Sequence, residues 1–333
     1  MLIINILLFA VGLVMLIKGG DWFVDGASSI ARRFKLPELL IGATVVSIGT
    51  TLPEVMVSVQ GAMAGSGGMA YGNAVGSIIC NTSLIAALTI AIKPGKVERR
   101  SLLMPVSFFF LAAAFYMTVA YTTQQFSRLV GIILLVTFVV YMVLTFLQMK
   151  KTPAKDLDGY DGGEAELFEA EPDTKQPPMI KDILFLIVGA ALIAVGARLL
   201  VSNGTAIAEE LGVPDTVIAL TFVALGTSLP ELVTAITALL KGHGALSLGN
   251  IIGANLFNLV LVSGASVVIS PFAVPSESQL MGVPSSLIMD LPVMLSVMLI
   301  MTVPALIRGK LSRAQGIVLL GVYAAFCTLQ FVM

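Results

Sequence analysis

Charged side chains are scarce in this sequence. Asp, Glu, Lys and Arg together make up 12% of the 333 residues, whereas 57% of the residues are hydrophobic. Soluble domains carry roughly 25% charged residues. The formal net charge of −1 leaves no basic surface to neutralise phosphates, which argues against nucleic-acid binding. Apolar runs of about twenty residues recur along most of the chain, a pattern typical of a polytopic helical membrane protein.

Cysteine and histidine are scarcer still. Cys80 and Cys327 both lie in apolar segments, where we expect them to be small buried hydrophobes. The single histidine, His243, lies in the short loop K-G-H-G, where we expect it to be solvated. Intramembrane hydrolysis needs a nucleophile with a base, or paired Asp residues, within the bilayer. Because the Asp residues of the apolar segments lie near predicted helix ends, the sequence does not indicate an enzyme.

The apolar segments predict an all-α polytopic membrane protein with ten transmembrane helices. The N-terminus lacks the basic region of a cleavable signal, so we interpret it as the first spanning helix. The first and sixth segments are long for one span, and we expect them to tilt strongly or to extend past the bilayer surface. The ten predicted helices are residues 2–33, 37–64, 70–92, 101–120, 127–148, 182–210, 214–240, 246–270, 286–307 and 312–332.

The basic residues predict the orientation of these helices. If the N-terminus lies outside, all but three of the 19 Lys and Arg residues fall in cytoplasmic loops, as the positive-inside rule requires. The exceptions are Lys18, Arg128 and Arg198. The expected location is therefore the cell membrane, plasma or inner, with both termini extracellular or periplasmic.

One long polar stretch separates the chain into two halves. Residues 150–181 are rich in Asp and Glu, but their spacing does not match a calcium-binding loop. We interpret them as a solvated, acidic cytoplasmic linker. The expected organisation is a first transmembrane half at 1–149, the linker at 150–181 and a second transmembrane half at 182–333.

The two halves repeat one another. With an offset of 177 residues, G-A-T-V-V-S-I-G-T-T-L-P-E (42–54) lies over A-L-T-F-V-A-L-G-T-S-L-P-E (219–231), with seven of thirteen positions identical. The same offset places G-N-A-V-G-S-I-I-C-N (72–81) over G-N-I-I-G-A-N-L-F-N (249–258). Each half has five predicted helices, and an odd number inverts the second half relative to the first. Such inverted repeats place a substrate site near the bilayer midplane, at discontinuous helices.

Each repeat places a carboxylate, Glu54 or Glu231, within an apolar segment. An ionisable residue there costs roughly 2.5–3.5 kcal/mol to insert and is a functional-site candidate by default. Pro53 and Pro230 lack an amide hydrogen, so we expect carbonyl groups one turn earlier to be freed and to line a polar cavity. The hydroxyl group three residues before each Glu has the spacing of a capping box.

The polar groups of the two motifs form an all-oxygen set of hydroxyls, amides, carbonyls and two carboxylates. Such a set favours hard cations such as Ca²⁺ and Na⁺ over zinc or copper. Two carboxylates that face each other in a low dielectric repel, so a cation between them or a proton on one is expected. The alternative is that the polar groups only pack helices together and that both Glu residues are buried, protonated acids.

The paired motifs resemble the alpha repeats of the Ca²⁺/cation antiporter superfamily, most closely its prokaryotic sodium/calcium exchanger branch. The resemblance covers almost the whole chain. It implies an antiporter that exchanges Ca²⁺ for Na⁺ by alternating access, with the first and sixth helices sliding across the other eight. The implied partners are Ca²⁺, monovalent cations and the lipid bilayer, without a cofactor and without an evident obligatory protein partner.

The resemblance also implies a set of ligands between the second, third, seventh and eighth helices. Glu54 and Glu231 would bind Ca²⁺ together with the carbonyl groups of Thr50 and Thr227. The other implied ligands are Asn81 and Asn258 at the central position and, for sodium, Ser47, Thr51, Ser77, Ala224 (through its carbonyl group) and Ser228.

Two positions depart from the pattern of the resembling family. Ala254 stands where Ser is usual, which removes a hydroxyl from one sodium position, and Asn258 stands where some prokaryotic members carry Asp. The driving ion is therefore open, and a proton-coupled cation exchanger remains an alternative. A cation channel is an alternative of a different class.

Overall fold

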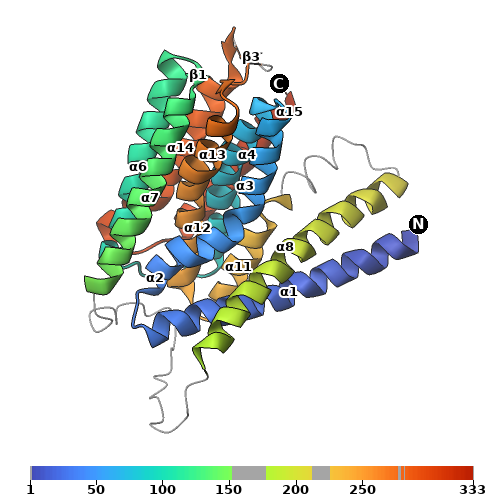
Figure 1. The fold of residues 1–333 in the computed structure, drawn as a ribbon, viewed down its shortest axis with the longest axis vertical. Coiled ribbons are helices and arrows are strands. Elements are labelled where there is room, and N and C mark those ends of the chain that lie inside the picture. The colour runs from blue at the N-terminus through green and yellow to red at the C-terminus, as the bar shows by residue number, and fades with distance from the viewer. Residues whose placement is uncertain (1, 152–177, 212–225, 277–278, 281, 333) are drawn as a thin grey trace.

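The computed structural model describes residues 2–151, 178–211, 226–276, 279–280 and 282–332, and nearly all of them are helical (Figure 1). The α-helices of the first half are α1 (Leu2–Arg33), α2 (Glu38–Ile41), α3 (Ser47–Met63), α4 (Gly67–Cys80), α5 (Ala87–Ile92), α6 (Arg99–Thr122) and α7 (Arg128–Lys151). Those of the second half are α8 (Met179–Glu210), α11 (Leu229–Leu240), α12 (Gly244–Phe257), α13 (Ser263–Ile269), α14 (Leu291–Arg308) and α15 (Arg313–Val332).

Among the described residues, four π-helical turns lie within or at the start of the long helices, namely η1 (Gly42–Val46), η2 (Asn81–Ala86), η5 (Asn258–Val262) and η6 (Ser286–Asp290). Three of them lie between consecutive α-helices of one span, so that Glu38–Met63, Gly67–Ile92 and Gly244–Ile269 are continuous. Side chains hold the loosened carbonyl groups of η1. Ser47 donates a hydrogen bond to the carbonyl of Gly42 at 2.8 Å, and Tyr141 donates one to the carbonyl of Ala43 at 2.9 Å.

Eight helices of the described chain are long and apolar enough to cross a membrane. The remaining two predicted spans contain α11, which is apolar but only 12 residues long as described, and α15, which has 20 residues. The predicted architecture of ten helices in two five-helix halves is confirmed. Most of the predicted linker, and the first part of the seventh predicted helix, lie outside the described residues.

The first helices of the two halves, α1 and α8, pack along each other and lie obliquely across the other helices (Figure 1). Glycines seven residues apart on both helices face each other, and a Cβ added at most of them would come within 2.9 Å of the opposite backbone. The facing pairs are Gly12 with Gly196, Gly19 with Gly189, and Gly26 with the carbonyl of Asp182. Because the numbers on one helix rise as those on the other fall, α1 and α8 are antiparallel, as an inverted repeat requires.

The α1–α8 pair is peripheral, and the span containing α12 and α13 is central. Only 17% of the most apolar window of α1 and 22% of that of α8 is buried, against 83% for Gly244–Ile269. Most of the surface of the α1–α8 pair is therefore available to lipid. The central span packs against α3, α4, α6, α7 and α11, which places residues of both repeats around it.

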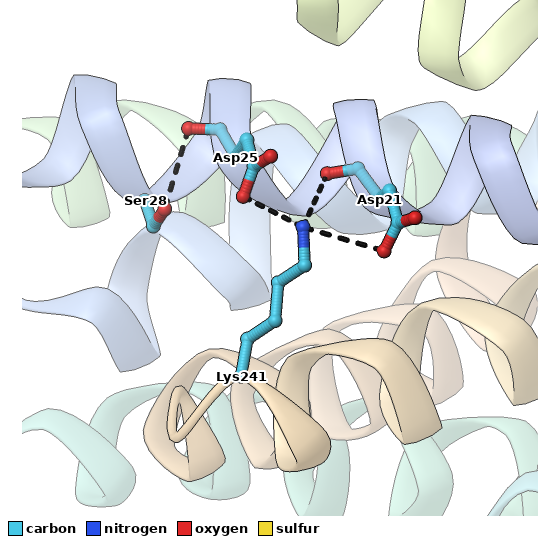
Figure 2. A network of polar contacts seen from close by, with 4 residues as sticks. All are labelled: Asp21, Asp25, Ser28 and Lys241. Carbon is cyan, nitrogen blue, oxygen red and sulfur yellow. Dashed lines mark hydrogen bonds and ion pairs between the residues drawn. The ribbon is translucent and has the colours of Figure 1, made fainter.

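Ion pairs join the C-terminal half of α1 to its neighbours. Lys241, just after α11, lies 2.8 Å from a carboxylate oxygen of Asp25 and 3.3 Å from one of Asp21 on α1 (Figure 2). Arg33 at the end of α1 pairs with Asp182 at the start of α8 at 2.9 Å. Figure 2 also shows Lys241 reaching the backbone carbonyl of Asp21, at 3.1 Å.

His243 is paired rather than solvated, which corrects the sequence-based expectation. Its Nδ1 lies 2.8 Å from a carboxylate oxygen of Glu38, and its side chain is only 18% exposed. The reason is that α2 begins beside the loop between α11 and α12, so that Glu38 covers the histidine ring.

Short strands lie in the loops at the end of the helices opposite to Lys241 and His243. Strand β1 (Gln125–Phe126) is antiparallel to β2 (Phe272–Ala273), and β3 (Gln279–Leu280) is antiparallel to β4 (Val283–Pro284). The loops with Lys96 and Lys310 are joined by an isolated β-bridge. Loops that the sequence predicts on one face of the membrane therefore lie together in the fold.

Candidate functional site

The polar residues of the two repeats come together in the middle of the molecule. The elements that carry them, α3, α4, η2, α11, α12 and η5, pack against one another. Nine of the residues implied by the resemblance are almost completely buried. They are Ser47, Thr50, Thr51, Glu54, Ser77, Asn81, Ser228, Glu231 and Asn258. Thr227 is partly buried, and Ala224 lies outside the described residues.

Glu54 on α3 and Glu231 on α11 are fully buried, and their carboxyl groups are close enough to interact directly. None of their four carboxylate oxygens has a hydrogen-bond partner in the described part of the chain. Two charges held together in this way repel each other strongly at low dielectric. A cation between them, or a proton on one of them, would remove that repulsion.

Other polar atoms around the two carboxyl groups also lack partners. The hydroxyl groups of Thr51 and Ser228 and both amide atoms of Asn81 and Asn258 are buried without a hydrogen bond to any described residue. Buried polar groups in native proteins are normally satisfied, and each exception needs an explanation. A cluster of orphaned oxygens around paired carboxyl groups has the chemistry of a site for a hard cation.

Asn81 and Asn258 occupy equivalent places in the backbone as well as in the sequence. Asn81 is the first residue of η2, and Asn258 is the first residue of η5. Turns of π-helix within α-helices occur frequently at functional sites, because the inserted residue loosens the backbone hydrogen bonding. The repeat symmetry seen in the sequence thus extends to the local backbone at these two amides.

The predicted backbone discontinuities differ between the halves. In the second half, residues 227–228 form a turn and α11 begins at Leu229, with Pro230 in its first turn, as predicted. In the first half, α3 continues through Pro53, so the prediction of a broken helix at this proline is wrong. The irregularity lies earlier, at the π-helical turn η1.

The predicted capping box does not form in either repeat. Ser228 is the N-cap of α11, but its side chain makes no capping hydrogen bond, and the hydroxyl of Thr51 is likewise unpartnered. The carboxyl groups of Glu54 and Glu231 lie close enough to interact with each other. Both hydroxyls are consequently left without an intrahelical role.

One polar network in the site was not predicted from the sequence. Asn250 on α12 is fully buried, and its Oδ1 accepts a hydrogen bond from Thr50 Oγ1 at 3.1 Å. Its backbone carbonyl accepts one from Ser47 Oγ at 2.9 Å. The sequence marks Asn250 as part of a repeated motif, but self-similarity within the chain does not tell which atoms of the two repeats meet.

The α1–α8 pair covers the site on one side. A narrow recess is lined by Phe23, Gly49, Thr50, Pro53, Ala190, Ile193, Ala194 and Pro230. Its walls therefore come from both motifs and from both helices of the pair. The ring of Phe23 lies against Gly49, where an added Cβ would come within 2.8 Å of it.

The described residues contain no cluster of three or more His, Cys, Asp or Glu side chains that could hold a metal ion. The oxygen set at the centre of the molecule has two carboxylates, with the remaining donors being hydroxyl, amide and carbonyl groups. Such a set carries little ligand charge, and ligand charge is one of the factors that tune the affinity of oxygen sites for Ca²⁺.

Comparison with known proteins gives consistent matches over both halves. A family model described as sodium/calcium exchanger protein matches residues 4–147 and 181–332. Sodium/calcium exchanger MaX1 of Methanosarcina acetivorans is 30% identical over 99% of both chains. Inner membrane protein YrbG of Escherichia coli is 36% identical over 79% of both chains. A solved structure of the sodium-calcium exchanger NCX_Mj, soaked with 10 mM Na⁺ and zero Ca²⁺, aligns over 98% of both chains with a TM-score of 0.77 and 31% identity.

Proposed function

The chain belongs to the sodium/calcium exchanger protein family of cation antiporters, and we propose that it exchanges cytoplasmic Ca²⁺ for external Na⁺ at the site formed by Glu54 and Glu231. The observation that carries this proposal is the pair of buried, facing carboxyl groups without hydrogen-bond partners among the described residues. An ionisable residue within a membrane span marks an ion pathway more often than a structural contact.

The proposed ligands are those that the family resemblance implies, and the burial of nine of them around the two carboxyl groups supports the assignment. Glu54 and Glu231 bind Ca²⁺ with the carbonyl groups of Thr50 and Thr227, and Asn81 and Asn258 occupy the central position. Sodium binds on either side of Ca²⁺, with Thr51, Ser77 and Ser228 contributing hydroxyl groups and Ser47 and Ala224 contributing carbonyl groups. The single proton of the Ser47 hydroxyl has two acceptors nearby, the carbonyls of Gly42 and Asn250.

Charge balance makes the two ions compete. Two carboxylates neutralise one Ca²⁺ or two monovalent ions, so the site does not hold both loads at once without excess positive charge. A buried charge is tolerated only when it is paired, and an empty site with two ionised carboxylates is therefore unfavourable. Exchange follows, because access to the site switches from one side of the membrane to the other most readily when the site holds one kind of ion or the other.

Alternating access is supplied by the α1–α8 pair. It is the most lipid-exposed part of the described chain, its two helices are held together by close glycine contacts, and it borders the recess beside both motifs. Sliding of this pair across the other helices opens the site first to one side of the membrane and then to the other. The site itself stays in place, as in other inverted-repeat transporters.

The test is Ca²⁺ uptake into proteoliposomes that contain the purified protein. Vesicles loaded with Na⁺ and diluted into Na⁺-free medium with radioactive Ca²⁺ are expected to accumulate Ca²⁺, and vesicles with equal Na⁺ on both sides are not. Absence of uptake under an outward Na⁺ gradient would show that sodium does not drive transport.

A proton-coupled exchanger is the second candidate, and Ala254 is the residue that favours it. This position lies on α12 and is fully buried, and it supplies no hydroxyl where its repeat equivalent, Ser77, does. A carboxyl group that takes up a proton needs no hydroxyl ligand. In the same vesicles, this candidate predicts Ca²⁺ uptake driven by a pH gradient in the absence of sodium.

A further inference from the structure

Asn250 connects the two repeats at the candidate cation site. It lies on α12 in the second half, yet its hydrogen-bond partners Ser47 and Thr50 are on α3 in the first half. Its Oδ1 accepts from Thr50 Oγ1 at 3.1 Å and lies 3.4 Å from Ser47 Oγ. All three side chains are buried to within 1% of complete burial, so water does not substitute for these contacts.

The hydroxyl of Thr50 has three possible acceptors around it. It lies 3.1 Å from the amide oxygen of Asn250 and 3.5 Å from the backbone carbonyl of Ser47, and the carboxyl group of Glu231 lies near it without a hydrogen bond. A hydroxyl group has one proton to donate and two lone pairs. When the proton points to Asn250, the lone pairs are free to face a cation held by Glu231. When it points to Glu231, the proton occupies the place that the cation needs.

We propose that Asn250 is a positioning residue for cation binding, which fixes the Thr50 hydroxyl with its proton away from the ion and its oxygen towards it. This inference rests on the proposed function and names a residue that acts on the ion through Thr50. Groups that orient metal ligands in this way typically change metal affinity 10- to 100-fold when they are removed.

The equivalent residue of the first repeat, Asn73, makes different contacts. Its Nδ2 donates to Ser58 Oγ at 2.7 Å and to the carbonyl of Glu54 at 3.2 Å. Neither of these partners is Thr50, and the amide of Asn73 acts as a donor where that of Asn250 acts as an acceptor. The repeat therefore offers a matched control residue of the same type, in the same motif, that should not act through Thr50.

A double-mutant cycle on the purified protein tests this proposal. Ca²⁺ affinity is measured by isothermal titration calorimetry for the wild type, Asn250→Ala, Thr50→Val and the double variant. We expect Asn250→Ala to weaken Ca²⁺ binding about tenfold, the effect of losing one well-placed hydrogen bond. In the Thr50→Val background, which lacks the hydroxyl, Asn250→Ala should have almost no further effect.

Two further variants separate positioning from general packing. Thr50→Ser restores a hydroxyl, so the sensitivity to Asn250→Ala should return. Asn73→Ala should change affinity by the same factor whether residue 50 is Thr or Val. If Asn250→Ala does not fold, Asn250→Leu, which keeps the branched shape without the amide, takes its place in the cycle.

The outcomes are distinct. If the effects of Asn250→Ala and Thr50→Val multiply, Asn250 acts independently of the Thr50 hydroxyl and the proposal is wrong. If the wild type itself binds no Ca²⁺, the proposed function fails and the positioning role fails with it. If the wild type binds and the cycle shows no coupling, only the positioning role is overturned.

Discussion

Glu54 and Glu231 occupy a position in which each destabilises the other unless something lies between them. Both are fully buried, and their carboxyl groups interact without any hydrogen bond to described residues. A structural role would call for neutralising partners, because unpaired buried charge costs several kcal/mol of folding free energy. A transported ion, which is not part of the protein, would supply the neutralising partner that the described residues do not.

Replacing either glutamate by glutamine tests whether its negative charge is needed to bind the ion. Glu54→Gln and Glu231→Gln keep the size of the side chain and remove one negative charge. We expect Ca²⁺ transport to be lost and Ca²⁺ affinity to fall at least about tenfold, since ligand charge sets affinity in oxygen sites. Uptake into proteoliposomes and calorimetric titration measure the two effects.

Thermal unfolding without ions provides the control for these two variants. Removing one of two repelling charges should leave the melting temperature of the ion-free protein unchanged or raised, while the stabilisation by added Ca²⁺ disappears. If the glutamates were instead helix-packing groups, both variants would melt lower and still transport. A variant with wild-type exchange would remove that residue from the site.

Ala254 is the residue at which the two repeats differ most directly in ligand chemistry. Its equivalent, Ser77, provides a buried hydroxyl, and Ala254 provides a methyl group. We expect Ala254→Ser to lower the Na⁺ concentration for half-maximal Ca²⁺ uptake several-fold, about what one added hydrogen-bonding oxygen contributes. The measurement is the Na⁺ dependence of uptake, with Ser77→Ala as the opposite change. An unaltered Na⁺ dependence would show that this position is not used.

At the residue scale, the sequence predicts which polar residues lie together in the fold better than it predicts which of their atoms are in contact. The offset of 177 residues identified both glutamates and both asparagines, because each has a counterpart in the other half. It did not identify the contact of Asn250 with Thr50, since pairing across the repeats depends on how the halves dock. It also suggested a capping box that does not form in either repeat.

At the scale of elements, α1 and α8 form a unit of their own. Their glycines bring the two backbones into contact over several turns, which leaves no room for a Cβ at the glycine positions. The seven-residue spacing of these glycines is visible in the sequence, but its meaning depends on knowing that α1 and α8 are partners. The salt bridge between Arg33 and Asp182 joins the same two helices at one end.

The ion pairs that join this unit to α11 are weaker than the contacts within it. Lys241 pairs with Asp21 and Asp25 on α1, but the two carboxylates are 36% and 49% exposed. Exposed pairs of this kind contribute about 0–1 kcal/mol, so these contacts are readily broken. This difference in strength matches a sliding mechanism in which α1 and α8 move together and separate from α11.

Cross-linking tests that mechanism with two matched pairs of cysteines. In a background with Cys80 and Cys327 replaced by Ala, Asp25→Cys with Lys241→Cys ties α1 to α11, whereas Arg33→Cys with Asp182→Cys ties α1 to α8. We expect a short thiol cross-linker to stop exchange in the first variant and to leave exchange intact in the second. When the linker is cleavable, reduction should restore exchange in the first variant.

The two cysteine pairs also exclude simpler explanations. Single-cysteine variants treated with the same reagent show whether modification alone inhibits transport. Exchange that continues after complete α1–α11 cross-linking would contradict sliding of α1 past α11. Inhibition by the α1–α8 cross-link would show that these helices move relative to each other and not as one unit.

At the scale of the whole molecule, loops from the two halves meet at each end of the helices. The loop with Lys96 is bridged to the loop with Lys310, and Arg99 donates a hydrogen bond to the carbonyl of Ile307 at 2.5 Å. At the other end, β1 pairs with β2. The sequence anticipated this grouping because an even number of predicted helices separates the loops of each face. The exact loop pairings are set by tertiary packing, which charge and hydropathy do not encode.

The absolute orientation follows from the distribution of positive charge. The face with Lys96 and Lys310 also carries Lys241, so we expect this face to be cytoplasmic and the β1–β2 face to be external. Single cysteines at Ser127, next to β1, and at Ala314, at the start of α15, report on the two faces, and both positions are exposed. A membrane-impermeant maleimide applied to intact cells should label Ser127→Cys and should reach Ala314→Cys only after permeabilisation. The reverse pattern would place the termini in the cytoplasm, and it would also reverse the side from which the site described above takes up Ca²⁺.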